Sequence, residues 1–251
     1  MRLCEAYERF DEARCELLLR PTAPAWTSAR SKRSVCAEAV GTLALDGELI
    51  DFEELFLSIS RPSPEEDNHT LLAAKNILRA LARIFAIRPA YVLPMHAASD
   101  CETVLELHEM ALEGLVPTPA LGVWRTDIEG AAGSFSGQGI PAHDIPDAMA
   151  RWSQAFAAET YDGHRLARLA DAYAVFDRIQ PFSIGNGRTG RLLLQSMAIE
   201  DGLPFFPISQ LLWENRAVCS DILSRAHASD GVDKWRSAFA DLCVDAIQRL
   251  R

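Results

Sequence analysis

The stretch that decides the fold spans Gln180–Arg191, reads QPFSIGNGRTGR, and runs directly into three leucines at 192–194. Its proline ends one helical pattern, and its second half has the composition of an anion-binding loop that opens the next helix. Gly185 and Gly187 allow backbone N–H groups to turn toward an oxyanion without a Cβ in the way. The unpaired N–H groups of a helix start carry about half a positive charge, which favours phosphate.

Two arginines add charge to this loop. Arg188 and Arg191 lie three positions apart, so on a helix they share a face and can both reach a polyphosphate. Asn186 can donate a hydrogen bond from its side chain into the same nest. The sequence therefore predicts a phosphate-binding site made of Gly185, Asn186, Gly187, Arg188 and Arg191.

The whole string resembles the signature of the Fic family, His-Pro-Phe-x-(Asp/Glu)-Gly-Asn-Gly-Arg-x-x-Arg, whose members mostly transfer AMP from ATP to a hydroxyl side chain of a target protein. The matching positions are Pro181, Phe182, Gly185, Asn186, Gly187, Arg188 and Arg191. The resemblance implies an all-α fold, a Fic-type helical bundle with a small β-hairpin flap, in which Phe182 anchors the loop. It also implies that Asn186 and the loop amides bind the α- and β-phosphates, assisted by Arg188. Arg191 would meet the γ-phosphate.

Two positions depart from this signature, and both carry chemistry in the family. Gln180 stands where the resemblance expects the histidine that takes the proton from the target hydroxyl. A neutral amide has no usable basicity near pH 7, and loss of a general base typically costs about a hundredfold to ten-thousandfold in rate. Ile184 stands where the family has the acid that holds magnesium, and an apolar side chain cannot ligate a hard cation. We therefore expect the ordinary transfer reaction to be lost or severely slowed.

Many Fic proteins also carry an inhibitory helix, (Ser/Thr)-x-x-x-Glu-(Gly/Asn), whose glutamate pairs with the second motif arginine. Two registers within the segment of about 34–47 fit this pattern in part. Thr42–Gly47 keeps the threonine and the glycine but has Asp46 as its acid, and an acidic amphipathic segment follows it. Ser34–Ala39 keeps the glutamate, Glu38, but lacks the following glycine. The downstream sequence favours Asp46 and leaves Glu38 as the alternative.

The composition places the chain among soluble globular proteins, with 49% hydrophobic residues. A net charge of −10 argues against a general nucleic-acid binder. No apolar run is long enough to span a bilayer, and the amino-terminal residues are too charged for a secretory signal. The six cysteines have no metal-ligand or redox spacing, which predicts mostly buried thiols, a reducing compartment and a cytoplasmic location.

Helical periodicity dominates the rest of the chain. Residues 1–30 are expected to form an accessory helical arm, and 31–251 a Fic-like domain containing the motif at 180–191. Between about 121 and 142 the pattern is interrupted by Gly130, Gly133, Gly137 and Gly139, and this stretch is similar to the Fic flap, a hairpin that lays a target segment beside the active site. Further helices are expected at 3–19, from 63 through 84, and at 100–112, 146–159, 164–179, 186–201, 209–228 and 232–249.

Two histidines, His108 and His164, do not fit a functional role. His108-Glu109 resembles the start of a zinc-protease helix, but the second histidine would fall at Leu112. His164 begins the helix that leads into the motif, too far along it to replace the base, and we expect it to be an exposed residue of the first turn.

The sequence thus predicts a degenerate Fic-domain protein that acts as a nucleotide-binding or protein-binding pseudoenzyme or regulator. ATP is the expected nucleotide, magnesium is not expected to be held, and the partner or target is expected to be a protein. Two alternatives stay open. One is an adenylyltransferase-like enzyme that moves AMP, or another nucleotide or phosphate moiety, by an altered mechanism. The other is an interaction scaffold that binds no nucleotide, so the sequence leaves open whether the chain is an enzyme.

Overall fold

The structure, a computed structural model, describes residues 2–18, 29–60, 68–86, 97–126, 139–203, 205–226 and 231–249. These residues form eleven α-helices, α1 to α11, and two short 3-10 helices, and none of them forms a β-strand. The α-helices are α1 (Arg2–Leu18), α2 (Ala29–Leu45), α3 (Phe52–Ser60), α4 (His69–Ala86), α5 (Cys101–Leu112), α6 (Ile145–Ala155), α7 (Arg165–Ile179), α8 (Asn186–Glu200), α9 (Ile208–Glu214), α10 (Arg216–Ala226) and α11 (Val232–Arg249).

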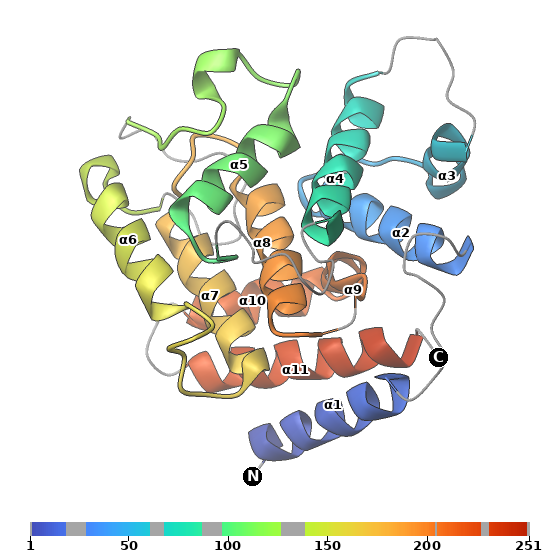
Figure 1. The fold of residues 1–251 in the computed structure, drawn as a ribbon, viewed down its shortest axis with the longest axis vertical. Helices are drawn as coiled ribbons and strands as arrows, with labels where there is room; N and C mark the ends of the chain where they lie inside the picture. Colours follow the sequence, from blue (N-terminus) through green and yellow to red (C-terminus); the bar gives the residue numbers. More distant parts are fainter. Residues whose placement is uncertain are drawn as a thin grey trace.

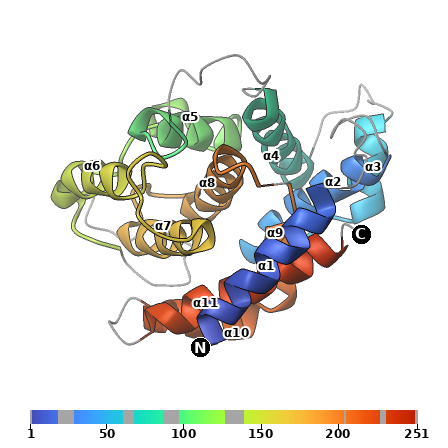
Figure 2. The same ribbon diagram turned by 60° about the horizontal axis from the view of Figure 1, so that its bottom comes forward.

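Helix α8 lies at the centre of the bundle, with α2, α4, α5 and α7 packed around it (Figures 1 and 2). Nearly all of its residues are buried, including Leu192, Leu193 and Leu194 directly after the motif. Its buried polar side chains, among them Asn186, Arg188 and Arg191, have hydrogen-bond partners inside the bundle. The motif loop therefore precedes the most buried helix of the molecule, which gives the loop a rigid base.

A second group of helices covers the other end of the bundle. Helix α1 lies along α11, as both views show, and α2 packs against α9 (Figures 1 and 2). The approach of α2 to α9 depends on Gly41, where a Cβ would lie 2.4 Å from the backbone nitrogen of Gln210. This contact fixes the carboxyl end of α2, and hence the segment that follows it, beside α8.

The all-α fold is confirmed, but the sequence placed some element boundaries wrongly. The predicted helix at 209–228 is two helices, because Asn215 ends α9 with a side-chain hydrogen bond to the Leu211 carbonyl (2.9 Å) and its own carbonyl starts α10. Helix α4 begins at His69 after a cap by Asn68, whose side chain accepts from the Leu71 amide (2.8 Å). The expected start signal at 63–66 lies outside the described residues.

The β-hairpin flap is not seen. At the two ends of the expected flap, residues 121–126 and 139–141 form turns, bends and extended backbone without strand pairing, and Ala142 opens a 3-10 helix. Residues 127–138 lie outside the described residues. Both ends nevertheless bond to the motif region: the Arg125 amide donates to the Pro181 carbonyl (2.9 Å), and the Ile140 amide donates to the Ile179 carbonyl (3.3 Å).

Two smaller expectations were also wrong. His164 is not an exposed residue: it caps α7 through its Nδ1, stacks on Tyr7 with ring centroids 4.0 Å apart, and its Nε2 lies 3.2 Å from Asp11. Helix α1 covers it, a contact that no local pattern reveals. Cys4 and Cys15 of α1 are exposed, whereas Cys36, Cys219 and Cys243 are buried as expected. Among the described helices none is long and apolar enough to cross a membrane.

Candidate functional site: the loop between α7 and α8

The motif loop is defined by two left-handed residues, one at each end. Helix α7 ends at Gln180, which has φ 50° and ψ 64°, and Pro181 prevents its continuation. Helix α8 begins after Gly185, which has φ 81° and offers no side-chain cap. A Cβ at Gly185 would lie 2.6 Å from Leu112 Cδ1, so glycine is required both for the backbone angle and for the packing.

Asn186 closes the loop. Its Oδ1 accepts from the Phe182 amide (2.8 Å) and its Nδ2 donates to the Phe182 carbonyl (2.7 Å). The side chain is buried, so in this structure its amide holds the loop backbone instead of pointing into an anion nest. This structural use of the amide was not predicted from the sequence, and the binding of phosphate by Asn186 stays a prediction.

Phe182 is confirmed as the core anchor of the loop. It is fully buried, its ring stacks on His108 with centroids 3.7 Å apart, and Trp124 lies 5.1 Å away. The anchor joins the loop to α5 and to the segment that leaves α5. An apolar ring at this position therefore fixes where the loop sits on the bundle.

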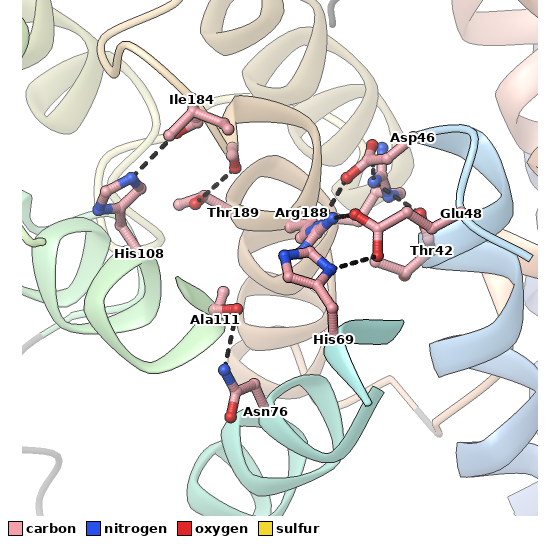
Figure 3. Close-up of polar contacts among 12 residues, drawn as sticks. Thr42, Asp46, Glu48, His69, Asn76, His108, Ala111, Ile184, Arg188 and Thr189 are labelled. Carbon is pink, nitrogen blue, oxygen red and sulfur yellow. Dashed lines mark hydrogen bonds and ion pairs between the residues drawn. The ribbon is translucent and has the colours of Figure 1, made fainter. Parts of the chain in front are cut away.

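His108 is a site residue that the sequence reasoning missed. The Gly122 amide donates to its Nδ1 (3.0 Å), which leaves the proton on Nε2, and Nε2–H donates to the Ile184 carbonyl (3.1 Å; Figure 3). Burial lowers the pKa of His108 to about 4, so the ring is neutral at pH 7. The sequence did contain a signal for this role: His108 lies on α5 between the core positions Leu107 and Ala111. This position predicts a side chain that faces the core rather than a zinc ligand.

Arg125, also missed, clamps the other end of the loop. It is buried; its Nε donates to the Gln180 carbonyl (2.7 Å) and its Nη2 donates to the Ile140 carbonyl. Because its guanidinium and its backbone amide both bind the 180–181 region, Arg125 joins the two ends of the 121–142 segment to the start of the loop. The guanidinium has only N–H donors, and carbonyl oxygens are suitable acceptors for them.

Gln180 is fully buried and its amide has a fixed orientation. Nε2 donates to the carbonyl of Asp177 (2.6 Å) and lies 3.2 Å from the Asp177 carboxylate. No titratable imidazole stands here, and among the described residues that contact the loop, His108 uses both ring nitrogens in hydrogen bonds. The structure therefore offers no histidine in place of the missing base.

The two motif arginines are held by acids from the end of α2. Arg188 donates from Nε to Asp46 Oδ2 (2.8 Å) and from Nη2 to Glu48, and Arg191 donates to Asp46 Oδ1 (2.6 Å) and to the Thr42 carbonyl (2.9 Å). Figure 3 shows Asp46 and Glu48 facing Arg188, and a dashed line joins Glu48 to His69 of α4. The His69 Nδ1 lies 3.7 Å from Glu48 Oε2.

The ion pairs between these acids and the motif arginines are largely shielded from solvent. The side chains of Arg188, Arg191 and Asp46 are 8%, 2% and 16% exposed, so the interaction is less screened than a surface pair. Burial acts to lower the pKa of Arg191, but Asp46 and the neighbouring Tyr173 more than offset it and leave that pKa raised. Removing one partner would leave a buried charge, which makes the pair costly to break from one side.

The two candidate inhibitory acids lie in different places. Asp46 contacts both arginines, whereas Glu38 contacts Ser209 at the start of α9, with 2.8 Å to its amide and 2.6 Å to its hydroxyl. Glu38 is buried, and burial raises its pKa. Its carboxylate satisfies helix-start donors of α9, a structural task.

Gly187 lets the acid and the arginine meet. A Cβ at this position would lie 2.7 Å from Arg191 Nη1 and 2.9 Å from Asp46 Oδ1. The same glycine that frees a loop amide for an anion thus also makes room for the carboxylate. The loop, both arginines and the end of α2 are therefore built as one contact.

The place of the expected metal ligand is at the surface. Ile184 is 44% exposed, and its carbonyl is used by His108. Within the described ranges no three His, Cys, Asp or Glu side chains gather as a metal site, and the acids that contact the motif arginines, Asp46 and Glu48, are engaged by them. These residues do not fit a magnesium ion held by the protein.

Comparisons with known proteins agree with this geometry. Residues 98–198 match the model of the Fic/DOC family. No curated protein matches the sequence significantly.

Among solved structures, a Fic family protein from Desulfovibrio desulfuricans is similar at a TM-score of 0.78 and 20% identity, over 98% of this chain and 74% of that chain. Fic-1 from C. elegans is similar at a TM-score of 0.74 and 19% identity, over 98% of this chain and 70% of that chain. A Fic domain containing signaling protein from Bacteroides thetaiotaomicron is similar at a TM-score of 0.71 and 16% identity, over 99% of this chain and 94% of that chain. At these identities the likeness shows the fold, and it extends over nearly the whole chain.

Proposed function

We propose that this chain is a nucleotide-binding regulator in which the ordinary transfer is lost, because residues 98–198 match the model of the Fic/DOC family, whose domains generally transfer nucleotide or phosphate moieties. The observation that carries the proposal is the loop itself. It keeps both arginines and its glycines, but has a buried amide at 180 and an apolar side chain at 184. We expect the loop to bind the phosphates of ATP and to do so without magnesium held by the protein.

The arrangement described here is the closed form of that loop. Asp46 and Glu48 occupy Arg188, and Asp46 also occupies Arg191. Carboxylates and phosphates compete for the same guanidinium faces. Asp46 is thus the inhibitory-type residue of this proposal, and Glu38 is a structural cap.

The partner of such a regulator is a protein. Fic proteins act on protein targets, and in this chain both ends of the 121–142 segment are tied to the loop through Arg125 and Ile140. A protein segment laid against 121–142 would therefore act directly on the backbone of Gln180. We propose this segment as the flap, where a partner binds by backbone pairing.

Calorimetric titration of ATP, with and without magnesium, tests the proposal. The wild-type chain should bind weakly and saturably, and Arg188→Ala should abolish binding because the phosphates lose a charge partner. Arg83→Ala is the matched control: it removes an exposed arginine that pairs with Glu106 (3.0 Å), and it should leave binding unchanged.

The variant Asp46→Asn/Glu48→Gln separates the outcomes. If neither the wild-type chain nor this released variant binds ATP, GTP or a CDP-linked nucleotide, the chain is the interaction scaffold and the loop survives only as structure. If either of them modifies a target with labelled ATP, the altered-mechanism transferase is correct and the regulator is wrong.

A further inference from the structure

The surrounding structure holds Gln180 in one defined conformation, which indicates a specific role for this residue. It is the one residue other than glycine with a positive φ among the described residues, and such a backbone conformation is rare for an L residue. The Arg125 guanidinium holds its carbonyl (2.7 Å), and Gly139 packs so closely that a Cβ there would lie 2.6 Å from Gln180 Cβ. The surrounding structure therefore fixes both the backbone and the side chain.

The orientation of the side-chain amide is unambiguous. Both partners of Nε2, the Asp177 carbonyl and carboxylate oxygens, are acceptors, so the nitrogen must face them and Oε1 must face away. Oε1 is buried and has no hydrogen-bond partner among the described residues. A buried amide oxygen without a donor is unfavourable, which points to a ligand that supplies one.

The donor must be small. Gln180 is fully buried, and Gly139 and Arg125 close around it, with Arg125 Nη2 only 2.9 Å from the position of a Cβ at Gly139. A hydroxyl carried on a protein segment cannot enter such a site without displacing these residues. A water molecule can, and buried waters typically serve polar groups that lack other partners.

We propose that Gln180 binds and orients a water molecule that hydrolyses a phosphoanhydride bond of a nucleoside triphosphate on the loop. This inference rests on the nucleotide binding proposed above. A glutamine amide orients the attacking water in known nucleotide hydrolases, where no strong protein base is needed. Gln180 is thereby an acceptor for the nucleophile, and Asp177, which turns its amide, is a positioning residue.

The step balances without a further reactant. The water oxygen forms a bond to the γ-phosphorus, the bond between that phosphorus and its bridging oxygen breaks, and the nucleoside diphosphate leaves with the electron pair. The proton of the water passes to a phosphate oxygen, because Oε1 accepts a hydrogen bond but does not take the proton. Arg188 and Arg191, once released by Asp46 and Glu48, stabilise the charge that develops.

The test measures ATP cleavage by the full chain carrying Asp46→Asn/Glu48→Gln, in water labelled with oxygen-18, with ATP affinity measured on the same samples. We expect phosphate that carries the label. Adding Gln180→Met should lower the rate about a hundredfold while the ATP affinity stays within about threefold, since this change removes the acceptor but keeps the length of the side chain. The rate with Gln180 should be flat between about pH 6 and 8, whereas Gln180→His should make it pH-dependent.

The outcomes are distinguishable. ATP that binds but releases no labelled phosphate, or a Gln180→Met rate equal to that of its parent, overturns the hydrolase and leaves the regulator intact. No ATP binding by the released variant overturns both. If Gln180→Met does not fold, Asp177→Asn replaces it, because an amide at 177 can turn Oε1 inward; an unchanged rate in that variant also overturns the proposal.

Discussion

The two sides of the motif loop are held by opposite kinds of chemistry. On the side of α5, neutral groups hold it: the His108 ring donates to the Ile184 carbonyl and stacks on the Phe182 ring. Within the loop, the Asn186 amide bonds the Phe182 backbone. On the side of α2, charges hold it: Asp46 and Glu48 against two arginines.

A neutral buried contact has no competitor in solution, whereas a carboxylate on an arginine can be exchanged for a phosphate. The α5 side therefore sets the shape of the loop, and the α2 side sets whether its charge is available. The predictions below test that division.

The largest effect is expected on the α5 side. Phe182→Ala should lower the free energy of unfolding by about 3–5 kcal/mol, because a fully buried ring is replaced by a cavity. Urea denaturation measures it. Phe52→Ala, on the peripheral helix α3, should cost much less since its ring is only partly buried. Equal losses at the two positions would mean that Phe182 is not an anchor.

His108 should make stability depend on pH. Its pKa is lowered to about 4, so between about pH 6.5 and 4 the unfolded chain binds a proton that the folded chain excludes. The free energy of unfolding should therefore fall as the pH is lowered through this window, by about 3 kcal/mol in all. His108→Asn should flatten this part of the profile in denaturation at pH 7, 5.5 and 4.5. Parallel profiles would contradict a neutral buried ring.

On the α2 side, removal of the acids should change the ATP affinity as well as the stability, because the buried arginines lose their carboxylate partners. Asp46→Asn/Glu48→Gln should strengthen ATP binding about tenfold, because the phosphates no longer compete with carboxylates for Arg188. Glu54→Gln is the control, a nearby exposed acid outside the contact. Calorimetry decides, and an affinity unchanged from wild type would show that these acids do not restrain the loop.

The smallest effect on stability is expected at the exposed position 184. Ile184→Asp should change the free energy of unfolding by less than about 0.5 kcal/mol, because the side chain is 44% exposed. It should make ATP binding magnesium-dependent. Together with Gln180→His it should restore self-modification with labelled ATP, and failure of this double variant would weaken the interpretation of the loop as a degenerate transfer site.

Much of this site could be predicted from local pattern. Local sequence was enough to single out the glycines, the arginines and Phe182, because their expected roles depend on backbone angle, charge and size at a fixed spacing. His108, Arg125 and Asp177 could not be found in the same way, since each acts on a backbone or side chain that another segment brings to it. The break at Asn215 was missed because the apolar pattern continues across it.

The sequence by itself determined that the chain folds into helices around a loop of glycines and arginines, with Gln180 and Ile184 where the resemblance expects a base and a metal ligand. Only the tertiary structure decided between Asp46 and Glu38 as the acid that meets the arginines, since the packing of α2 on α9 at Gly41 sets which turn of α2 faces α8. It also decided that Gln180 is buried, oriented and left with one acceptor to fill. Spacing along a chain fixes which groups are present, but contacts between segments far apart in the chain fix which atoms of those groups remain available for chemistry.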